Sequence, residues 1–268
     1  MKRALTELML MDCLFIIFLS LSGMLFGGVG GLFYVLAFAL PTSLILLIWK
    51  RRDAEIFRIS VTCDSSSLKS AALLAFPTVF VLLVVSFLTS ILMQIIGVSA
   101  ESAELTGNMP FLIITKAFAP AVFEEMFFRY IPIMGLGKHS PRLTVIYSSI
   151  LFAFAHCNIF QIPYALVAGV IFCAVDLAVG SVLPSILIHF LNNVLSIIWQ
   201  TKGEESVFIV VFLSAISLLA LVSVGLILLD RKKMREKFDF VFKDKSKFMF
   251  TYILLYIAVT LFAAFESI

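Results

Sequence analysis

Three short motifs place ionisable or amide side chains inside long apolar segments of the chain. These residues are Glu124, Glu125 and Arg129 in the first motif, His156 in the second, and His189 with Asn193 in the third. An ionisable group in hydrocarbon costs at least about 2.5–3.5 kcal/mol on insertion scales, so such groups are rare and usually functional. Carboxylate and imidazole groups are common general acids and bases. The motifs therefore indicate acid–base chemistry in an apolar setting.

The spacing of the first motif separates its two glutamates. Glu125 and Arg129 are four residues apart, so on a helix they share a face and can form an ion pair. Glu124 is rotated by about 100° from Glu125 and lacks that local partner. We expect Glu124 to be the carboxylate that acts as general base or acid, and Glu125 with Arg129 to support it.

The third motif presents two hydrogen-bonding groups from one helical face. His189 and Asn193 are four residues apart and can hold a water or donate to a developing oxyanion. At a helical rise of about 1.5 Å per residue, Glu124, His156 and His189 lie about 18, 21 and 12 Å from the inner ends of their segments. These depths predict one water-filled cavity in the middle to inner half of a bilayer, reached from the cytoplasm.

The composition identifies the kind of protein that must position these groups. Of 268 residues, 62% are hydrophobic and 14% are charged, and the mean hydropathy is +1.11. A soluble domain is about half apolar and roughly a quarter charged. The composition excludes a secreted soluble enzyme, a cytosolic globular domain and a disordered protein. It predicts a multi-pass membrane protein, and no nucleic-acid partner is expected.

The predicted fold is all-α, a polytopic transmembrane helix bundle of eight to nine spans within one membrane domain, residues 1–268. A spanning helix needs about 20 apolar residues. Applied along the chain, this window gives nine candidate spans, at residues 9–27, 31–49, 70–97, 109–136, 142–161, 162–179, 181–199, 206–229 and 248–266. The motifs fall in the fourth, fifth and seventh spans, so the fourth to seventh, about 109–199, form the predicted catalytic core.

The basic residues predict the orientation of these spans. With the N-terminus in the cytoplasm, 17 of the 20 lysines and arginines lie in inner loops, including the loop 230–247. Outer segments would hold almost none of them. The positive charge of loop 230–247 is explained by this topology rule alone. A role of the loop in docking anionic lipid or a partner is a weaker hypothesis.

In this order and at this depth, Glu-Glu-x-x-x-Arg, Phe-x-x-x-His and His-x-x-x-Asn resemble the motifs of the CPBP intramembrane proteases. That family includes the type II CAAX prenyl endopeptidases and the bacteriocin-processing (Abi) proteins. The motifs cover about residues 124–193. The resemblance implies an intramembrane endopeptidase, with Glu125 and Arg129 in supporting positions.

The resemblance also implies roles for the other motif residues. Glu124 and His156 would activate a water for attack on a peptide carbonyl, and His189 and Asn193 would stabilise the oxyanion. We favour a mechanism at this site that uses no metal or other cofactor. The alternative is a divalent metal such as zinc held by Glu124, His156 and His189, although the HExxH helix of zincins is absent.

The expected substrate is a membrane-embedded or lipidated peptide or protein. It would be a prenylated C-terminus in a eukaryotic host, or a leader or pheromone peptide in a bacterial one. The compact chain with short loops favours a bacterial cell membrane. The alternative function is a non-enzymatic membrane scaffold, such as an immunity factor or a membrane protein that regulates a sensor kinase. A transporter is disfavoured because paired, Gly/Pro-broken spans are missing.

Other polar residues in the spans are interpreted as structural. Asp176 is expected to make a polar contact inside the bundle, and Lys116 to extend toward the outer edge of the membrane. Cys157 follows His156 directly, but neighbours on a helix point apart, so a Cys–His pair is discounted. Pro120 is predicted to bend the helix that carries Glu124.

Overall fold

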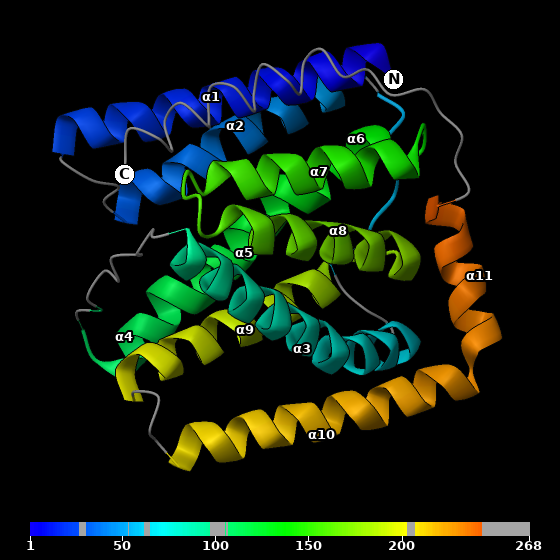
Figure 1. Ribbon diagram of the computed structural model, residues 1–268. Coiled ribbons are helices and arrows are strands. Elements are labelled where there is room, and N and C mark those ends of the chain that lie inside the picture. Colours follow the sequence, from blue (N-terminus) through cyan, green and yellow to red (C-terminus); the bar gives the residue numbers. More distant parts are fainter. Residues whose placement is uncertain are drawn as a thin grey trace.

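The structure, a computed structural model, is built from helices joined by short non-helical segments in the part of the chain that it describes (Figure 1). That part comprises residues 1–26, 31–52, 54–61, 65–96, 105, 107–202 and 207–242. Within these residues the extended pairing is a single isolated bridge between Ser60 and Ser181. The predicted all-α fold class is therefore confirmed.

Among the described residues, six helices are long and apolar enough to cross a membrane. They are α1 (Lys2–Phe26), α2 (Gly31–Arg51), α3 (Ser65–Ile95), α8 (Ile162–Val179), α9 (Leu183–Lys202) and α10 (Val207–Leu229). The helical stretch 109–136 and the shorter apolar helix α7 (Pro141–Ala155) correspond to two more predicted spans. The ninth prediction, 248–266, lies outside the described residues. The protein is an integral, multi-pass membrane protein.

The fourth span is an unbroken helical stretch with two widened turns. Its pieces are α4 (Met109–Leu112), the π-helix η1 (Ile113–Phe118), α5 (Ala119–Glu125), the π-helix η2 (Met126–Tyr130) and α6 (Ile131–Leu136). Each π-helix ends two residues before a proline, Pro120 or Pro132. A proline has no N–H for the carbonyl four residues earlier, and a wider turn re-pairs the neighbouring groups.

The second widened turn shows how the freed carbonyl is satisfied. The amide of Ile131 donates to the carbonyl of Met126, five residues back. The carbonyl of Phe128, which Pro132 cannot bond, accepts a hydrogen bond from the Ser148 hydroxyl at 2.5 Å. This bond ties the fourth span to α7. The prolines therefore set the local geometry on both sides of α5, which ends with the two glutamates.

The predicted end of the fifth span is wrong. The fifth span, predicted to reach residue 161, ends at Ala155, and His156 is the C-cap residue of α7. The chain leaves the helix there because Cys157 takes a left-handed conformation with φ of 45°. A turn then leads into α8, whose first turn contains Pro163.

The region 230–247, predicted as a loop, contains the helix α11 (Arg231–Phe242). The loop prediction rested on its charge, but the sequence lacks Gly and Pro and spaces its apolar residues for one face. Phe238 packs against the core and Val241 is fully buried. The ring of Phe240 stacks on Phe57 with centroids 6.4 Å apart. Helix α11 therefore folds back on the bundle.

Segments predicted to be inner loops meet at one end of the bundle. In the segment 54–61, the amide of Phe57 donates to the Met134 carbonyl at 2.9 Å, and Ser60 bridges to Ser181 in the turn between α8 and α9. Figure 1 shows the start of α1, the turn between α6 and α7, and α11 at this same end. The arrangement agrees with placing all these segments on one side of a membrane.

Candidate active site

His189 joins the two glutamates of the first motif. Its Nδ1 lies 2.7 Å from Oε1 of Glu125, and its Nε2 lies 4.0 Å from Oε2 of Glu124. A carboxylate oxygen only accepts, so Nδ1 carries a proton in this contact. The contact brings α5 and α9 together and fixes the orientation of the imidazole ring. Its second nitrogen, Nε2, is turned toward Glu124.

Glu125 and Arg129 form the predicted ion pair. Arg129 Nε lies 3.1 Å from Glu125 Oε2, and both side chains are fully buried. The guanidinium carbon also lies 3.8 Å from the centroid of the Phe152 ring. A buried ion pair is tolerated only when each charge keeps its partner. Glu125 thus has one oxygen on Arg129 and the other on His189, as expected of a supporting residue.

Glu124 has a partner that the sequence did not reveal. The hydroxyl of Tyr34, on α2, donates to Glu124 Oε1 at 2.7 Å. The Glu124 side chain keeps 16% of its surface exposed, whereas Glu125 keeps none. Nothing in the spacing pairs Tyr34 with Glu124, because the two residues are ninety positions apart. Among these two neighbours, Glu124 is the carboxylate that solvent or a ligand can reach.

His156 lies at the end of α7, next to an aromatic ring that it shares with His189. Its Nδ1 is 2.7 Å from the carbonyl oxygen of Phe152, which requires a proton on Nδ1 and leaves Nε2 free to accept one. The ring of Phe152 packs edge-on to His156 at 4.9 Å and to His189 at 5.8 Å. Both histidines therefore border the same aromatic side chain.

Asn193 lies one helical turn beyond His189 on α9 and is half-buried. The side chain of its neighbour Asn192 hydrogen-bonds the hydroxyl of Tyr164 on α8. The helix thus places Asn193 on the same face as His189.

A buried carboxylate supports the start of α9. Asp176, fully buried on α8, accepts hydrogen bonds from the backbone N–H of Ser185 at 3.2 Å and from its hydroxyl at 2.6 Å. Ser185 precedes His189 by one helical turn. The predicted structural contact of Asp176 is therefore present, and it anchors the turn of α9 that leads to His189. Lys116 is exposed on η1.

The candidate site residues could in principle bind a metal ion through their carboxylate and imidazole groups. They contain no group of three or more His, Cys, Asp or Glu side chains placed to hold a metal ion. Glu124 and His189 approach each other, but Glu125 already occupies one nitrogen of His189. The described side chains therefore do not form a ligand set for a metal ion.

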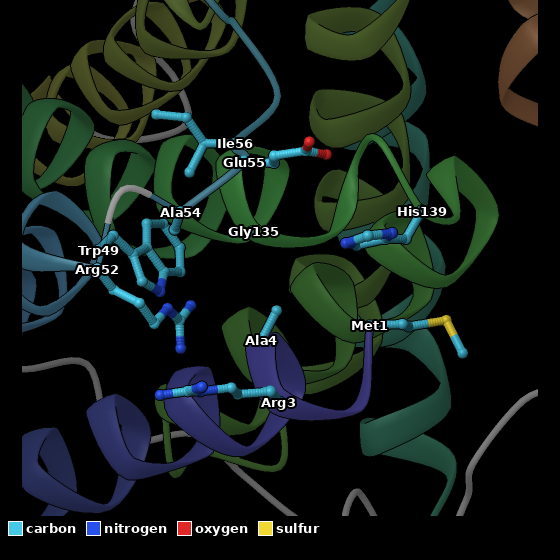
Figure 2. Close-up of a pocket in the computed structure, with 10 residues that line it drawn as sticks. All are labelled: Met1, Arg3, Ala4, Trp49, Arg52, Ala54, Glu55, Ile56, Gly135 and His139. Atoms are coloured by element: carbon cyan, nitrogen blue, oxygen red, sulfur yellow. The ribbon is translucent and has the colours of Figure 1, made fainter.

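A cavity of about 200 Å³ lies at the end of the bundle near the N-terminus, away from these groups (Figure 2). It is lined by Met1, Arg3, Ala4, Trp49, Arg52, Ala54, Glu55, Ile56, Gly135 and His139. Arg52 and Trp49 both donate to Glu7, and a hydrogen bond from Lys138 lowers the pKa of Glu55. None of the predicted site residues lines this cavity.

Comparison with known protein families identifies the segment that carries the site. Residues 106–195 match the family model described as Rce1-like, type II CAAX prenyl endopeptidase Rce1-like. The match covers about a third of the chain and includes Glu124, His156, His189 and Asn193. No curated protein and no solved structure matches the chain. The predicted resemblance to the CPBP intramembrane proteases is confirmed for this segment.

Proposed function

We propose that the protein is an intramembrane endopeptidase that hydrolyses a peptide bond of a membrane-associated peptide or protein. The observation that carries the proposal is the contact of His189 with both glutamates, inside a segment that matches a protease family. The buried Glu125–Arg129 pair holds this arrangement, and Glu124 retains exposed surface. A carboxylate with access to water beside an oriented imidazole is suited to general base catalysis.

In the proposed mechanism, Glu124 and His156 bind and polarise one water. The water oxygen attacks the carbonyl carbon of the scissile peptide bond while its proton passes to Glu124. The negative charge that develops on the carbonyl oxygen is stabilised by donors from His189 and Asn193. In its imidazolium form, His189 keeps the Nδ1 bond to Glu125 and offers Nε2–H to that oxyanion. The C–N bond then breaks, and Glu124 returns the proton to the leaving amine.

The proposed substrate is a peptide that reaches the site from the bilayer or its inner surface. A prenylated C-terminus and a leader or pheromone peptide are the two candidate kinds. The N-terminus is proposed to be cytoplasmic, because the segments that gather at one end of the bundle carry most of the basic residues. The short loops favour a bacterial cell membrane.

Cleavage by the purified protein in liposomes tests the proposal. Fluorogenic peptides with and without a C-terminal prenyl group are compared on wild type and Glu124→Gln. The substitution keeps the shape of the side chain but removes the base, and loss of a general base lowers kcat by about 10²–10⁴-fold. Glu55→Gln, which changes an exposed carboxylate outside the site, is the matched control and retains full activity.

Two results would contradict this proposal. Equal cleavage by wild type and Glu124→Gln would remove Glu124 from the chemistry and favour a scaffold. In the same assay, the metal-free mechanism predicts that treatment with a chelator leaves the rate unchanged. A loss of activity that added zinc restores would replace the proposed mechanism with a metal-dependent one.

A further inference from the structure

The Tyr34–Glu124 hydrogen bond joins the candidate site to a helix outside the matched segment. Tyr34 lies on α2, whereas the family match begins at residue 106. We propose that Tyr34 is a positioning residue that orients the Glu124 carboxylate for the reaction. The inference rests on the proposed function, since it assigns Tyr34 a part in the chemistry of Glu124.

The two carboxylate oxygens of Glu124 have different neighbours. Oε1 accepts the hydrogen bond from the Tyr34 hydroxyl at 2.7 Å, and Oε2 is the oxygen that faces His189 Nε2 at 4.0 Å. The second distance is too long for a direct hydrogen bond. Tyr34 thus engages one oxygen and leaves the other, on the His189 side, to take the proton of a bound water. Without the hydroxyl, the carboxylate could rotate about its last side-chain bond.

The ring of Tyr34 is itself held in place by aromatic packing. It contacts Phe38, one helical turn further along α2, edge-on with ring centroids 4.9 Å apart. Phe38 is 4% exposed and packs against Phe15 of α1 and Phe127 of η2, with centroids at 4.8 and 5.4 Å. Figure 1 shows α1 and α2 side by side along one face of the bundle. The hydroxyl is therefore presented to Glu124 from a fixed ring.

This support comes from a part of the chain that the three motifs do not include. The same aromatic cluster contacts Phe127, two residues after Glu125, so α1 and α2 brace the helix of the glutamates as well as bonding one of them. Helix α2 therefore contributes to the site through Tyr34, and α1 packs behind it. The alternative is a structural role only, in which the hydroxyl merely satisfies a half-buried carboxylate.

Kinetics of Tyr34→Phe separate these two roles. The substitution keeps the ring and its contact with Phe38 and removes only the hydroxyl. The matched control is Tyr147→Phe, which removes a tyrosine hydroxyl that donates to a buried carboxylate, Asp12, outside the site. Both variants are purified and reconstituted beside wild type and Glu124→Gln, and thermal unfolding confirms that each is folded.

For Tyr34→Phe we expect kcat to fall about tenfold, the effect of losing one hydrogen bond to a charged group, while KM changes by less than about twofold. Tyr147→Phe should keep wild-type kcat. Wild-type kcat in Tyr34→Phe, or equal losses in both tyrosine variants, would overturn the inference while Glu124→Gln remains inactive. If wild type itself cleaves no peptide, the proposed function fails and this inference fails with it.

Discussion

At the scale of single residues, each charged group of the candidate site has an identified partner. Glu125 divides its oxygens between Arg129 and His189, and Glu124 divides its own between Tyr34 and the side that faces His189. Charges buried in an apolar bundle are stable only when they are paired in this way. The partition leaves Glu124 as the partly exposed member of the two glutamates.

The Glu125–Arg129 pair makes a prediction about stability. Arg129→Met removes the guanidinium that pairs with Glu125 in the bundle interior, which should lower the free energy of unfolding by about 3–5 kcal/mol. The double variant Glu125→Gln with Arg129→Met removes both charges and should recover a large part of that loss. Thermal unfolding in detergent measures both effects.

The matched control for this prediction is Arg142→Met, which changes an exposed arginine on α7. A surface change of this kind alters stability by no more than about 0.5 kcal/mol. If Arg129→Met were as stable as this control, the buried pair would not support the site. If the double variant were less stable than Arg129→Met, the loss of stability in Arg129→Met would not come from burying the Glu125 charge without its partner.

The contacts of the site differ in how far the sequence could predict them. The Glu125–Arg129 pair followed from four-residue spacing on one helix, a relation that every α-helix enforces. The bond between His189 and Glu125 and that between Tyr34 and Glu124 join different helices. Their formation depends on how the helices pack, and spacing along one chain holds no information about it. The motifs therefore identified the site residues but not their partners on other helices.

At the scale of elements, breaks in helix geometry lie beside the site residues. The two π-helices flank α5 and follow from Pro120 and Pro132. α7 ends at Ala155, with His156 as its C-cap residue, because Cys157 is left-handed. Apolar periodicity predicted the spans but could not predict these breaks, since it records which residues avoid water and not where backbone geometry changes. The high charge of residues 231–242 likewise led to the prediction of a loop where the structure has helix α11.

The left-handed residue after His156 makes a prediction about backbone strain. A residue with a Cβ pays roughly 1–2 kcal/mol in this conformation, and glycine does not. Cys157→Gly should therefore raise the free energy of unfolding by about 1 kcal/mol and leave the turn after α7 intact. Cys13→Gly, placed within helix α1, should instead lower it by about 1 kcal/mol.

Thermal unfolding of these two glycine variants provides the comparison. Opposite shifts in Tm relative to wild type would support a left-handed backbone at Cys157. Equal losses in both variants would show that residue 157 continues the helix, and His156 would then not terminate α7.

At the scale of the whole molecule, the site draws on helices from both halves of the chain. The matched segment supplies the glutamates, both histidines and Asn193. The α1–α2 hairpin supplies Tyr34 and much of the aromatic packing around the helix of the glutamates. Composition alone predicted a polytopic bundle, because no soluble fold could cover so much apolar surface. It could not predict that the first two spans join the site.

The most direct test of the central claim is a comparison of membrane peptides from host cells that carry wild type or Glu124→Gln at equal levels. Mass spectrometry of chain ends in the two strains detects each membrane-associated peptide that loses a segment. We predict at least one cleaved product that is present with wild type and absent with Glu124→Gln. Identical sets of chain ends in both strains would contradict it.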